Sequence, residues 1–319
     1  MILTTEGLTK TFEVGVRRRR VHAVQDLTLQ VNEGEIFGFV GPNGAGKTTT
    51  IKMLMGLIHP TSGRASIFDL PIPSRSAKAR LGYLPEHPAY HEFLTGREAL
   101  HFFAQVAGVP SRERAARCDE LLAQVGLAEA GDRPIRKYSK GMQQRLGLAQ
   151  ALVGDPALLV LDEPMSGLDP IGRKDVRDLM LDLKRRGKTI FFSTHILTDV
   201  ETLCDRVGII LGGRLRDSGK LSELLTGGVT SVELTALAPE RARAALSGGT
   251  LLSAEGDRVS AVFPDEAAAD AAVRALLGAG GRLLSLTPQR ETLEDFLVRR
   301  LDEDRAPGAG RAPQAASDT

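Results

Sequence analysis

One stretch of the chain combines glycines, a lysine and threonines in an arrangement that can bind phosphate. It reads Gly41, Pro42, Asn43, Gly44, Ala45, Gly46, Lys47, Thr48, Thr49. The first eight residues match the pattern GxxxxGK[ST], in which glycines let successive backbone N–H groups point at one anion. Lys47 can reach the outer phosphates of a nucleotide, and the Thr48 hydroxyl can ligate Mg²⁺. Residues 41–49 therefore predict a nucleotide-binding P-loop rather than a simple glycine-rich turn.

Two acids, Asp162 and Glu163, follow the apolar run 158–161, which is typical of a buried parallel strand. Burying two carboxylates is costly unless a cation receives them, and Mg²⁺ is the obvious candidate. We expect Asp162 to hold the ion, directly or through water. We expect Glu163 to orient or deprotonate the water that attacks the γ-phosphate. The pair favours hydrolysis over phosphoryl transfer to a metabolite.

Three further motifs are Tyr138-Ser139-Lys140-Gly141-Met142-Gln143-Gln144-Arg145, Ser166-Gly167-Leu168-Asp169 and Ser193-Thr194-His195. Together with the P-loop and the acidic pair, they resemble in order and spacing the motifs of ABC transporter ATP-binding subunits. The resemblance covers roughly residues 2–222. It implies an α/β fold of the P-loop NTPase class, an ABC-type ATPase domain with a helical insertion.

The resemblance also implies roles for single residues. Ser139, Lys140, Gly141 and Met142 form the signature motif, whose Ser and Gly positions contact the γ-phosphate of an ATP held by the opposite subunit. Asp169 matches the loop at that dimer interface, and His195 matches the switch histidine beside the γ-phosphate. Phe12 matches the aromatic that stacks on adenine, although a core position is the alternative. Because the chain carries one P-loop and one signature motif, two complete sites need a head-to-tail pair, and we expect a homodimer.

Two motifs depart from the family pattern, one at Glu86 and the other at Lys140 and Met142. Glu86 stands where the family has a metal-binding glutamine; a carboxylate can still ligate Mg²⁺, but it adds negative charge beside the nucleotide. Lys140 and Met142 replace the usual Gly and Gln of the signature motif. The Lys140 side chain can contact phosphate or be solvated, and we expect it to be solvated. Both departures are similar to those of the subfamily that serves ABC-2-type exporters.

Apolar runs and helical stretches predict the elements that position these residues. Strands are expected at 36–40, 158–161 and 189–193, and helices within 95–130 and over 173–186. We expect an ATPase domain over residues 1–225, with its helical insertion at about 87–150.

A small α+β domain is expected over residues 228–301, after a boundary at Gly227-Gly228. Its predicted strands are 231–234, 258–262 and 282–286, and its predicted helices are 239–246, 264–277 and 291–300. The segment 292–297 resembles the C-terminal extension of exporter ATPases, or else forms an ordinary amphipathic helix. The tail, 302–319, has the composition of a disordered segment.

Composition excludes several classes of protein. Lys and Arg total 41 against 40 Asp and Glu, a formal net charge of +1, which disfavours a nucleic-acid partner. The two cysteines, Cys118 and Cys204, cannot form a disulfide scaffold or a thiolate zinc site. No run of about 18–20 apolar residues predicts a membrane span. The basic run Arg17–Arg20 fits a solvated hairpin tip or a contact with anionic lipid.

These observations predict an ATP-binding and ATP-hydrolysing subunit that powers a separate membrane permease, an ABC-2-type exporter. By resemblance, the permease docks at 85–97, where Tyr90, Phe93 and Leu94 lie, and the subunit sits at the cytoplasmic face of the membrane. An import ATPase subunit and a non-transport ABC ATPase are the alternatives. The single P-loop and the short stretch of chain between Thr48 and Ser139 speak against the non-transport types. The sequence does not determine the transported molecule.

Overall fold

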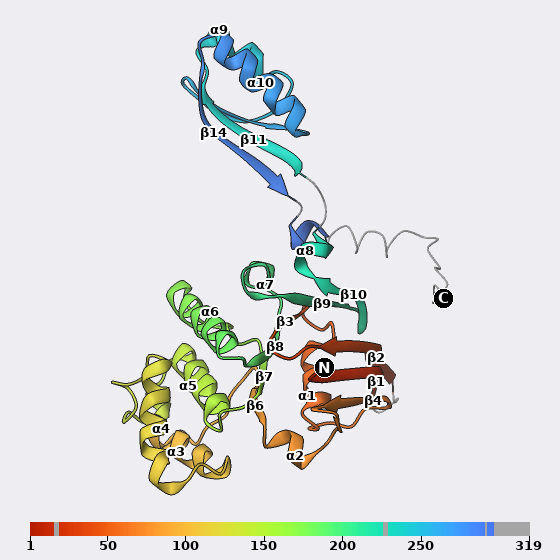
Figure 1. Cartoon of the computed structure of the whole chain (residues 1–319), viewed down its shortest axis with the longest axis vertical. Helices are drawn as coiled ribbons and strands as arrows, with labels where there is room; N and C mark the ends of the chain where they lie inside the picture. The colour runs from red at the N-terminus through yellow and green to blue at the C-terminus, as the bar shows by residue number, and fades with distance from the viewer. Residues whose placement is uncertain (16–18, 226–228, 291, 297–319) are drawn as a thin grey trace. The chain divides into compact units, whose positions relative to one another are not determined.

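The computed structural model describes residues 1–15, 19–225, 229–290 and 292–296. The chain divides into two compact units, Met1–Leu221 and Ser222–Thr319, and each is described here by itself (Figure 1). The predicted boundary at 227–228, the arginines at 17 and 18, and the tail 302–319 lie outside the described residues.

A six-stranded sheet carries most of the residues that the motifs single out. Its strand order is β10 (Arg214–Lys220), β9 (Arg206–Leu211), β3 (Ile36–Val40), β8 (Thr189–Thr194), β7 (Leu158–Asp162), β6 (Leu81–Leu84). All pairs from β9 to β6 are parallel, and β10 is antiparallel. β3, β7 and β8 are buried along their whole length, as the apolar runs predict. Because their carboxyl ends share one edge, the P-loop, the acidic pair and His195 emerge there together.

A second sheet of unit 1 is antiparallel and packs over the first. Its order is β2 (Arg19–Val31), β1 (Leu3–Val14), β4 (Ser62–Ile67), β5 (Leu70–Pro71). Both sheets and helix α1 (Lys47–Leu54) contribute to one buried apolar cluster, which includes Leu3, Ile51 and Phe191. The Phe191 ring stacks on Phe37 with centroids 5.8 Å apart and lies 5.5 Å from Phe39. This core fixes the P-loop between a rigid strand and a rigid helix.

Three helices form the helical part of unit 1, namely α3 (Gly96–Val106), α4 (Ser111–Gln124) and α5 (Lys140–Leu152). They contact one another and lie grouped beside the sheet (Figure 1). A capping box starts α3, because the Thr95 hydroxyl and the Glu98 side chain each bind the other's backbone N–H. The helices expected within 95–130 are thus confirmed as α3 and α4. The remaining helical segments of this unit are α2 (Arg75–Lys78), η1 (Ile135–Lys137), α6 (Pro170–Arg185), α7 (Leu197–Leu203) and the start of α8 (Leu221–Leu224).

Unit 2 is a four-stranded antiparallel sheet covered on one face by helices. Its order is β12 (Thr250–Glu255), β13 (Arg258–Phe263), β11 (Val229–Leu237), β14 (Arg282–Arg290), with α9 (Glu240–Arg243), η2 (Ala244–Leu246) and α10 (Glu266–Gly278). A buried cluster including Leu234, Phe263 and Leu276 joins sheet and helices. The α+β character of this segment is confirmed, and its predicted strands lie within β11, β13 and β14.

Two details of unit 2 differ from expectation. β12 was missed: every residue in it is exposed, so it lacks the alternation of apolar and polar residues that marks a half-buried strand. The expected helix 239–246 is a short α9 followed by the 3₁₀ turn η2. In the C-terminal segment, Leu293 and Phe296 are buried, and residues 297–301 lie outside the described part.

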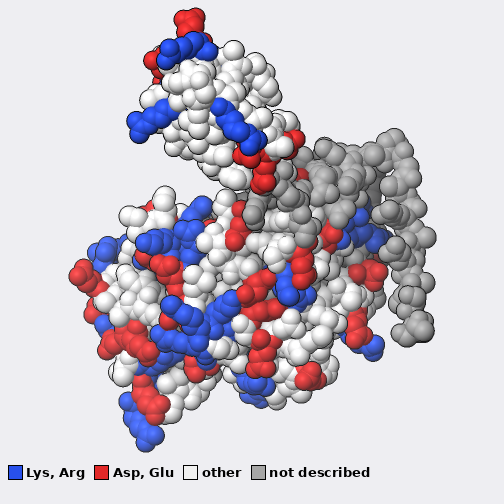
Figure 2. Space-filling model, turned by 45° about the horizontal axis from the view of Figure 1, so that its top comes forward, with Lys and Arg blue, Asp and Glu red and all other residues white. Residues whose placement is uncertain are grey.

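Basic and acidic side chains are interspersed over the face of unit 1 that Figure 2 shows, without a broad area of one sign. This agrees with the nearly balanced composition. Within the described ranges, none of the helices is both long enough and apolar enough to traverse a lipid bilayer.

Candidate nucleotide site

The P-loop connects β3 to α1 and surrounds a cavity of about 270 Å³. Gly46 has φ +108°, and a Cβ there would lie 2.4 Å from the Ala23 carbonyl oxygen. A Cβ at Gly41 would lie 2.2 Å from the Ile210 carbonyl oxygen, whereas at Gly44, with φ +80°, it would meet only open space. Because Gly46 is the N-cap of α1 and has no side chain to cap it, the first N–H groups of the helix are available to an anion.

Lys47 brings a positive charge into this cavity. Its side chain is 6% exposed, and Nζ donates to the carbonyl oxygens of Gly41 at 2.7 Å and Pro42 at 3.3 Å. Nζ also lies 3.4 Å from Oε1 of Glu163, which is 8% exposed. The P-loop lysine and Glu163, the acid that follows β7, therefore form a buried ion pair.

Asp162 lies at the end of β7, and hydrogen-bond donors reach only one of its two carboxylate oxygens. Oδ1 accepts hydrogen bonds from the Ser193 hydroxyl at 2.6 Å and the Thr48 hydroxyl at 3.3 Å. In the part of the chain that the structure describes, no hydrogen-bond partner reaches the buried Oδ2. Burial raises the pKa of the Asp162 carboxyl above its usual value, and the charge of Glu86 adds to the rise.

Several oxygen atoms at this point can act as ligands of Mg²⁺. Asp162 offers a free carboxylate oxygen and Thr48 a hydroxyl, and Glu86, which follows β6, lines the same cavity. Among the described residues, no group of three or more His, Cys, Asp or Glu side chains forms a complete metal site. Mg²⁺ commonly uses one or two carboxylates and takes its other ligands from phosphates and water, so this set suits an ion that arrives with a nucleotide.

Glu163 is held by His195 and by the backbone of β8. The imidazole Nδ1 of His195 lies 3.0 Å from both carboxylate oxygens, and because an ionised carboxylate only accepts, Nδ1 carries the proton. The Glu163 N–H donates to the Ser193 hydroxyl and carbonyl oxygens at 3.1 and 3.2 Å. Glu163 therefore faces the P-loop lysine on one side and the histidine on the other.

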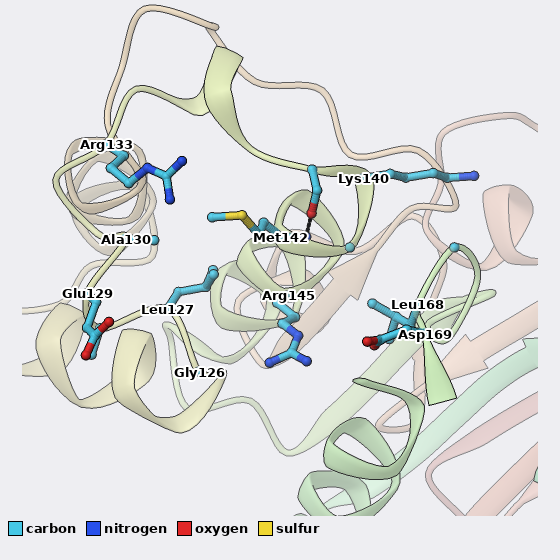
Figure 3. Close-up of a pocket in the computed structure, with 14 residues that line it drawn as sticks. Gly126, Leu127, Glu129, Ala130, Arg133, Lys140, Met142, Arg145, Leu168 and Asp169 are labelled. Carbon is cyan, nitrogen blue, oxygen red and sulfur yellow. Dashed lines mark hydrogen bonds between the residues drawn. The ribbon is translucent and has the colours of Figure 1, made fainter. Parts of the chain in front are cut away.

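The signature motif lies against a separate cavity of about 920 Å³ (Figure 3). Ser139 is the N-cap of α5 and accepts from the Met142 N–H at 3.2 Å. Lys140 is exposed, as expected, and its aliphatic carbons lie so close to Gly167 that a Cβ there would be 2.9 Å away. A Cβ at Gly141 would lie 3.3 Å from a terminal methyl of Leu168, a tight contact that a small shift of this side chain relieves. Leu168 and Asp169 line the cavity opposite Met142 (Figure 3).

Asp169 and Phe12 have local partners. Asp169 caps α6, since its carboxylate accepts from the Gly172 N–H at 2.9 Å. Phe12 lies on β1 with 36% of its surface exposed, outside the apolar core cluster and outside the residues that line the P-loop cavity. The Lys10 ammonium lies 5.1 Å from the centre of its ring.

The structure thus brings together the P-loop, Glu86, the acidic pair and His195, and places the signature motif and Asp169 at another cavity. Sequence reasoning missed two contacts. Ser193 was noted only as part of a motif, yet it binds both acids. The Gln144 side chain, which had no assigned role, reaches the Glu163 carbonyl. No periodicity or motif signal could have shown either contact.

Comparisons with known proteins all indicate the same family. Residues 24–166 match the family model "ABC transporter". An ABC transporter ATP-binding protein of Synechocystis sp., itself uncharacterized, is 41% identical over 305 residues, 95% of this chain and 85% of that protein. The bacitracin transport ATP-binding protein BcrA of Bacillus licheniformis is 45% identical over 67% of this chain and 68% of its own. A fluoroquinolones export ATP-binding protein of Mycobacterium tuberculosis is 44% identical over 60% of this chain and 64% of its own.

Solved structures agree with the fold of unit 1. The ATP-binding subunit of an ABC transporter aligns with a TM-score of 0.64 and 31% identity, over 71% of this chain and 92% of its own. The dimeric structure of a post-hydrolysis state of the ATP-binding cassette MJ0796, bound to ADP and Pi, also has a TM-score of 0.64. Its identity is 23%, over 69% of this chain and 99% of its own, so it supports the fold alone. The predicted α/β P-loop NTPase fold is confirmed.

The Ser193 contact yields a test of the metal site. Ser193→Ala removes the buried donor that orients Asp162, so we expect the Mg²⁺ concentration for half-maximal binding of a fluorescent ATP analogue to rise about tenfold. The control is Ser62→Ala, at an exposed serine on β4, which should leave the Mg²⁺ dependence unchanged. An unchanged midpoint in Ser193→Ala would show that Asp162 does not depend on this hydroxyl to bind the ion.

Proposed function

The chain belongs to the ABC transporter ATP-binding protein family, and from this premise we propose that its P-loop site hydrolyses ATP to drive a separate membrane permease. The observation that carries the proposal is the buried Lys47–Glu163 ion pair and the hydrogen bond from His195, an exposed imidazole, to the same Glu163 carboxylate. Lys47 starts α1, Glu163 follows β7 and His195 follows β8. The three side chains meet beside a cavity lined by the P-loop. A binding module without turnover has no need of a buried carboxylate and an imidazole at that point.

The reaction assigns each side chain one task. P-loop N–H groups and Lys47 bind the β- and γ-phosphates, whose negative charge competes with Glu163 for the Lys47 ammonium. Glu163, freed from that ion pair, accepts a proton from the attacking water. His195 orients the Glu163 carboxylate through Nδ1, so the carboxylate keeps its direction when Lys47 turns to the phosphates.

Mg²⁺ is the proposed cofactor, held by Thr48, Asp162 and Glu86. When bound, it neutralises charge on the phosphate oxygens. Asp162 is suited to this because its Oδ2 is buried and unshared among the described residues.

The second half of each site comes from another copy of the chain. The signature motif lines a cavity different from that of the P-loop, so one chain holds two half-sites rather than one whole site. A two-fold head-to-tail homodimer completes both, with Ser139 and Gly141 against the partner's γ-phosphate and Asp169 at the interface. Phe12 is proposed as the stacking partner of adenine, since its ring is exposed.

The permease is proposed to be an ABC-2-type exporter in the membrane, with this subunit on the cytoplasmic face. Support comes from the named export and antibiotic-transport relatives and from the Lys140 and Met142 departures in the signature motif. We assign ATP hydrolysis to a domain of residues 1–225 with its insertion at about 87–150. We assign residues 228–301 to a second, small α+β domain.

Segment 85–97 is the proposed docking surface for the permease. Phe93 is 83% exposed there, with the Arg136 guanidinium 5.9 Å from its ring, and the Tyr90 hydroxyl is buried without a hydrogen-bond partner in the described part of the chain. Exposed aromatic surface of this kind is typical of a protein–protein contact.

The general-base assignment is tested by Glu163→Gln. The amide keeps the size of the side chain but cannot accept the proton from water, so ATP turnover should fall by about 100-fold or more while ATP still binds. Steady-state phosphate release and equilibrium ATP binding measure the two properties. Glu33→Gln, at an exposed acid of unit 1, is the control. Normal turnover in Glu163→Gln would refute the proposed mechanism.

The dimer is tested with the signature motif. Glu163→Gln should form an ATP-dependent dimer, visible by light scattering, and Gly141→Asp in that background should abolish it, because a carboxylate would face the partner's phosphates. The new Cβ needs only a small shift of the terminal methyl of Leu168, 3.3 Å away, so each chain should still bind ATP. Gly248→Asp, at an open position of unit 2, is the matched control. A dimer that survives Gly141→Asp would place the interface elsewhere.

Docking is tested by Phe93→Asp, which should reduce co-sedimentation of the subunit with membranes of its own host by about tenfold and leave basal ATP hydrolysis unchanged. Leu57→Asp alters an apolar side chain that is 58% exposed elsewhere on unit 1 and should change neither property. Equal membrane binding by both variants would exclude Phe93 from the docking surface.

A further inference from the structure

The backbone of Glu163 has a conformation that side chains rarely adopt. Its φ is +51°, in the left-handed region that favours glycine. A strained residue of this kind persists only where its surroundings hold it in place. Because Asp162 ends β7 immediately before it, this one turn sets the direction in which the Glu163 carboxylate leaves the sheet.

Two buried side chains hold the turn, one on each side. Toward the sheet, the Glu163 N–H donates to Ser193. On the other side, the Gln144 amide Nε2 lies 3.2 Å from the Glu163 carbonyl oxygen and 3.3 Å from the Pro164 carbonyl oxygen. A side-chain amide nitrogen carries two hydrogens, so it can donate to both carbonyls. Gln144 is 2% exposed, so water cannot replace it easily.

Gln144 lies on α5, the helix that starts at the signature motif. Ser139 caps the helix, and Gln144 lies in its second turn. The backbone hydrogen bonds of a helix make these turns move as one body. A shift of α5 therefore reaches the Glu163 backbone through a direct hydrogen bond.

We propose that Gln144 is a positioning residue for ATP hydrolysis. Its amide holds the left-handed turn at Glu163. The direction of the Glu163 carboxylate therefore depends on the position of α5, the helix that starts at the signature motif. In a head-to-tail dimer, the N-terminus of α5 meets the nucleotide of the other copy, so each chain's general base responds to the nucleotide that its partner holds. The inference rests on the proposed function, since it takes Glu163 as the base.

The test is Gln144→Met, which keeps the length of the side chain and removes the donor. We expect kcat to fall about tenfold or more, because small displacements of a reacting group have large effects on rate. The ATP dissociation constant should stay within about twofold, since no phosphate contact is lost. Gln150→Met, six residues further along the same helix at a half-buried position, should leave kcat unchanged.

A double-mutant cycle separates positioning from a general loss of structure. In the Glu163→Gln background, whose residual turnover is measured with radiolabelled ATP, Gln144→Met should have no further effect, because it acts through the Glu163 carboxylate. The inference is overturned if Gln144→Met leaves kcat unchanged, or if it lowers the residual turnover of Glu163→Gln by the same factor.

Gln144→Leu serves where Gln144→Met does not fold. Its apolar side chain has no hydrogen-bond donor and brings no charge into the buried site, and the same two criteria apply. Failure of the proposed function would be seen separately, as normal turnover in Glu163→Gln with an intact Gln144. An unchanged kcat in the Gln144 variant that folds would overturn the positioning role alone.

Discussion

Unit 1 depends on the burial of two adjacent carboxylates at the end of β7. Asp162 and Glu163 are almost wholly inaccessible to water, and charges so placed must find partners inside the protein. Asp162 has the hydroxyls of Ser193 and Thr48 on one oxygen, and Glu163 has Lys47 and His195. The P-loop, β8 and the helix that starts at Lys47 are therefore held in register by the need to neutralise these acids.

The candidate site is divided between two cavities. The P-loop cavity is lined by Lys47 and Glu163, and the signature motif faces another cavity whose lining includes Lys140, Arg145 and Asp169. Each half-site ends at a helix N-terminus, α1 in one and α5 in the other, and helix N-termini favour anions. A triphosphate between two copies would satisfy both, which is the physical basis of the proposed dimer. Within one chain, the Gln144 contact is the direct link from α5 to the acids.

Much of the fold could be predicted because it depends on local pattern. The buried strands β3, β7 and β8 are continuous apolar runs, and α6 begins at an Asp169-Pro170 cap, so periodicity and capping locate them. β12 could not be predicted, since its strand character comes from pairing with β13 and its side chains are exposed. The exposure of Phe12 on β1 likewise could not be read from a strand pattern.

By itself, the sequence determined the chemistry of the site: which residues can bind phosphate and magnesium, and in what order they occur. Glycine spacing, a lysine and an acidic pair have that capacity wherever the fold places them. Only the tertiary structure decided how they act together. It set the Lys47–Glu163 ion pair, the contacts of the Ser193 hydroxyl with both acids, the left-handed turn at Glu163 and the hydrogen bond from Gln144 to the Glu163 carbonyl oxygen. The physical reason is that these contacts join residues 19 to 116 positions apart, and their geometry arises from packing between elements rather than from any local pattern.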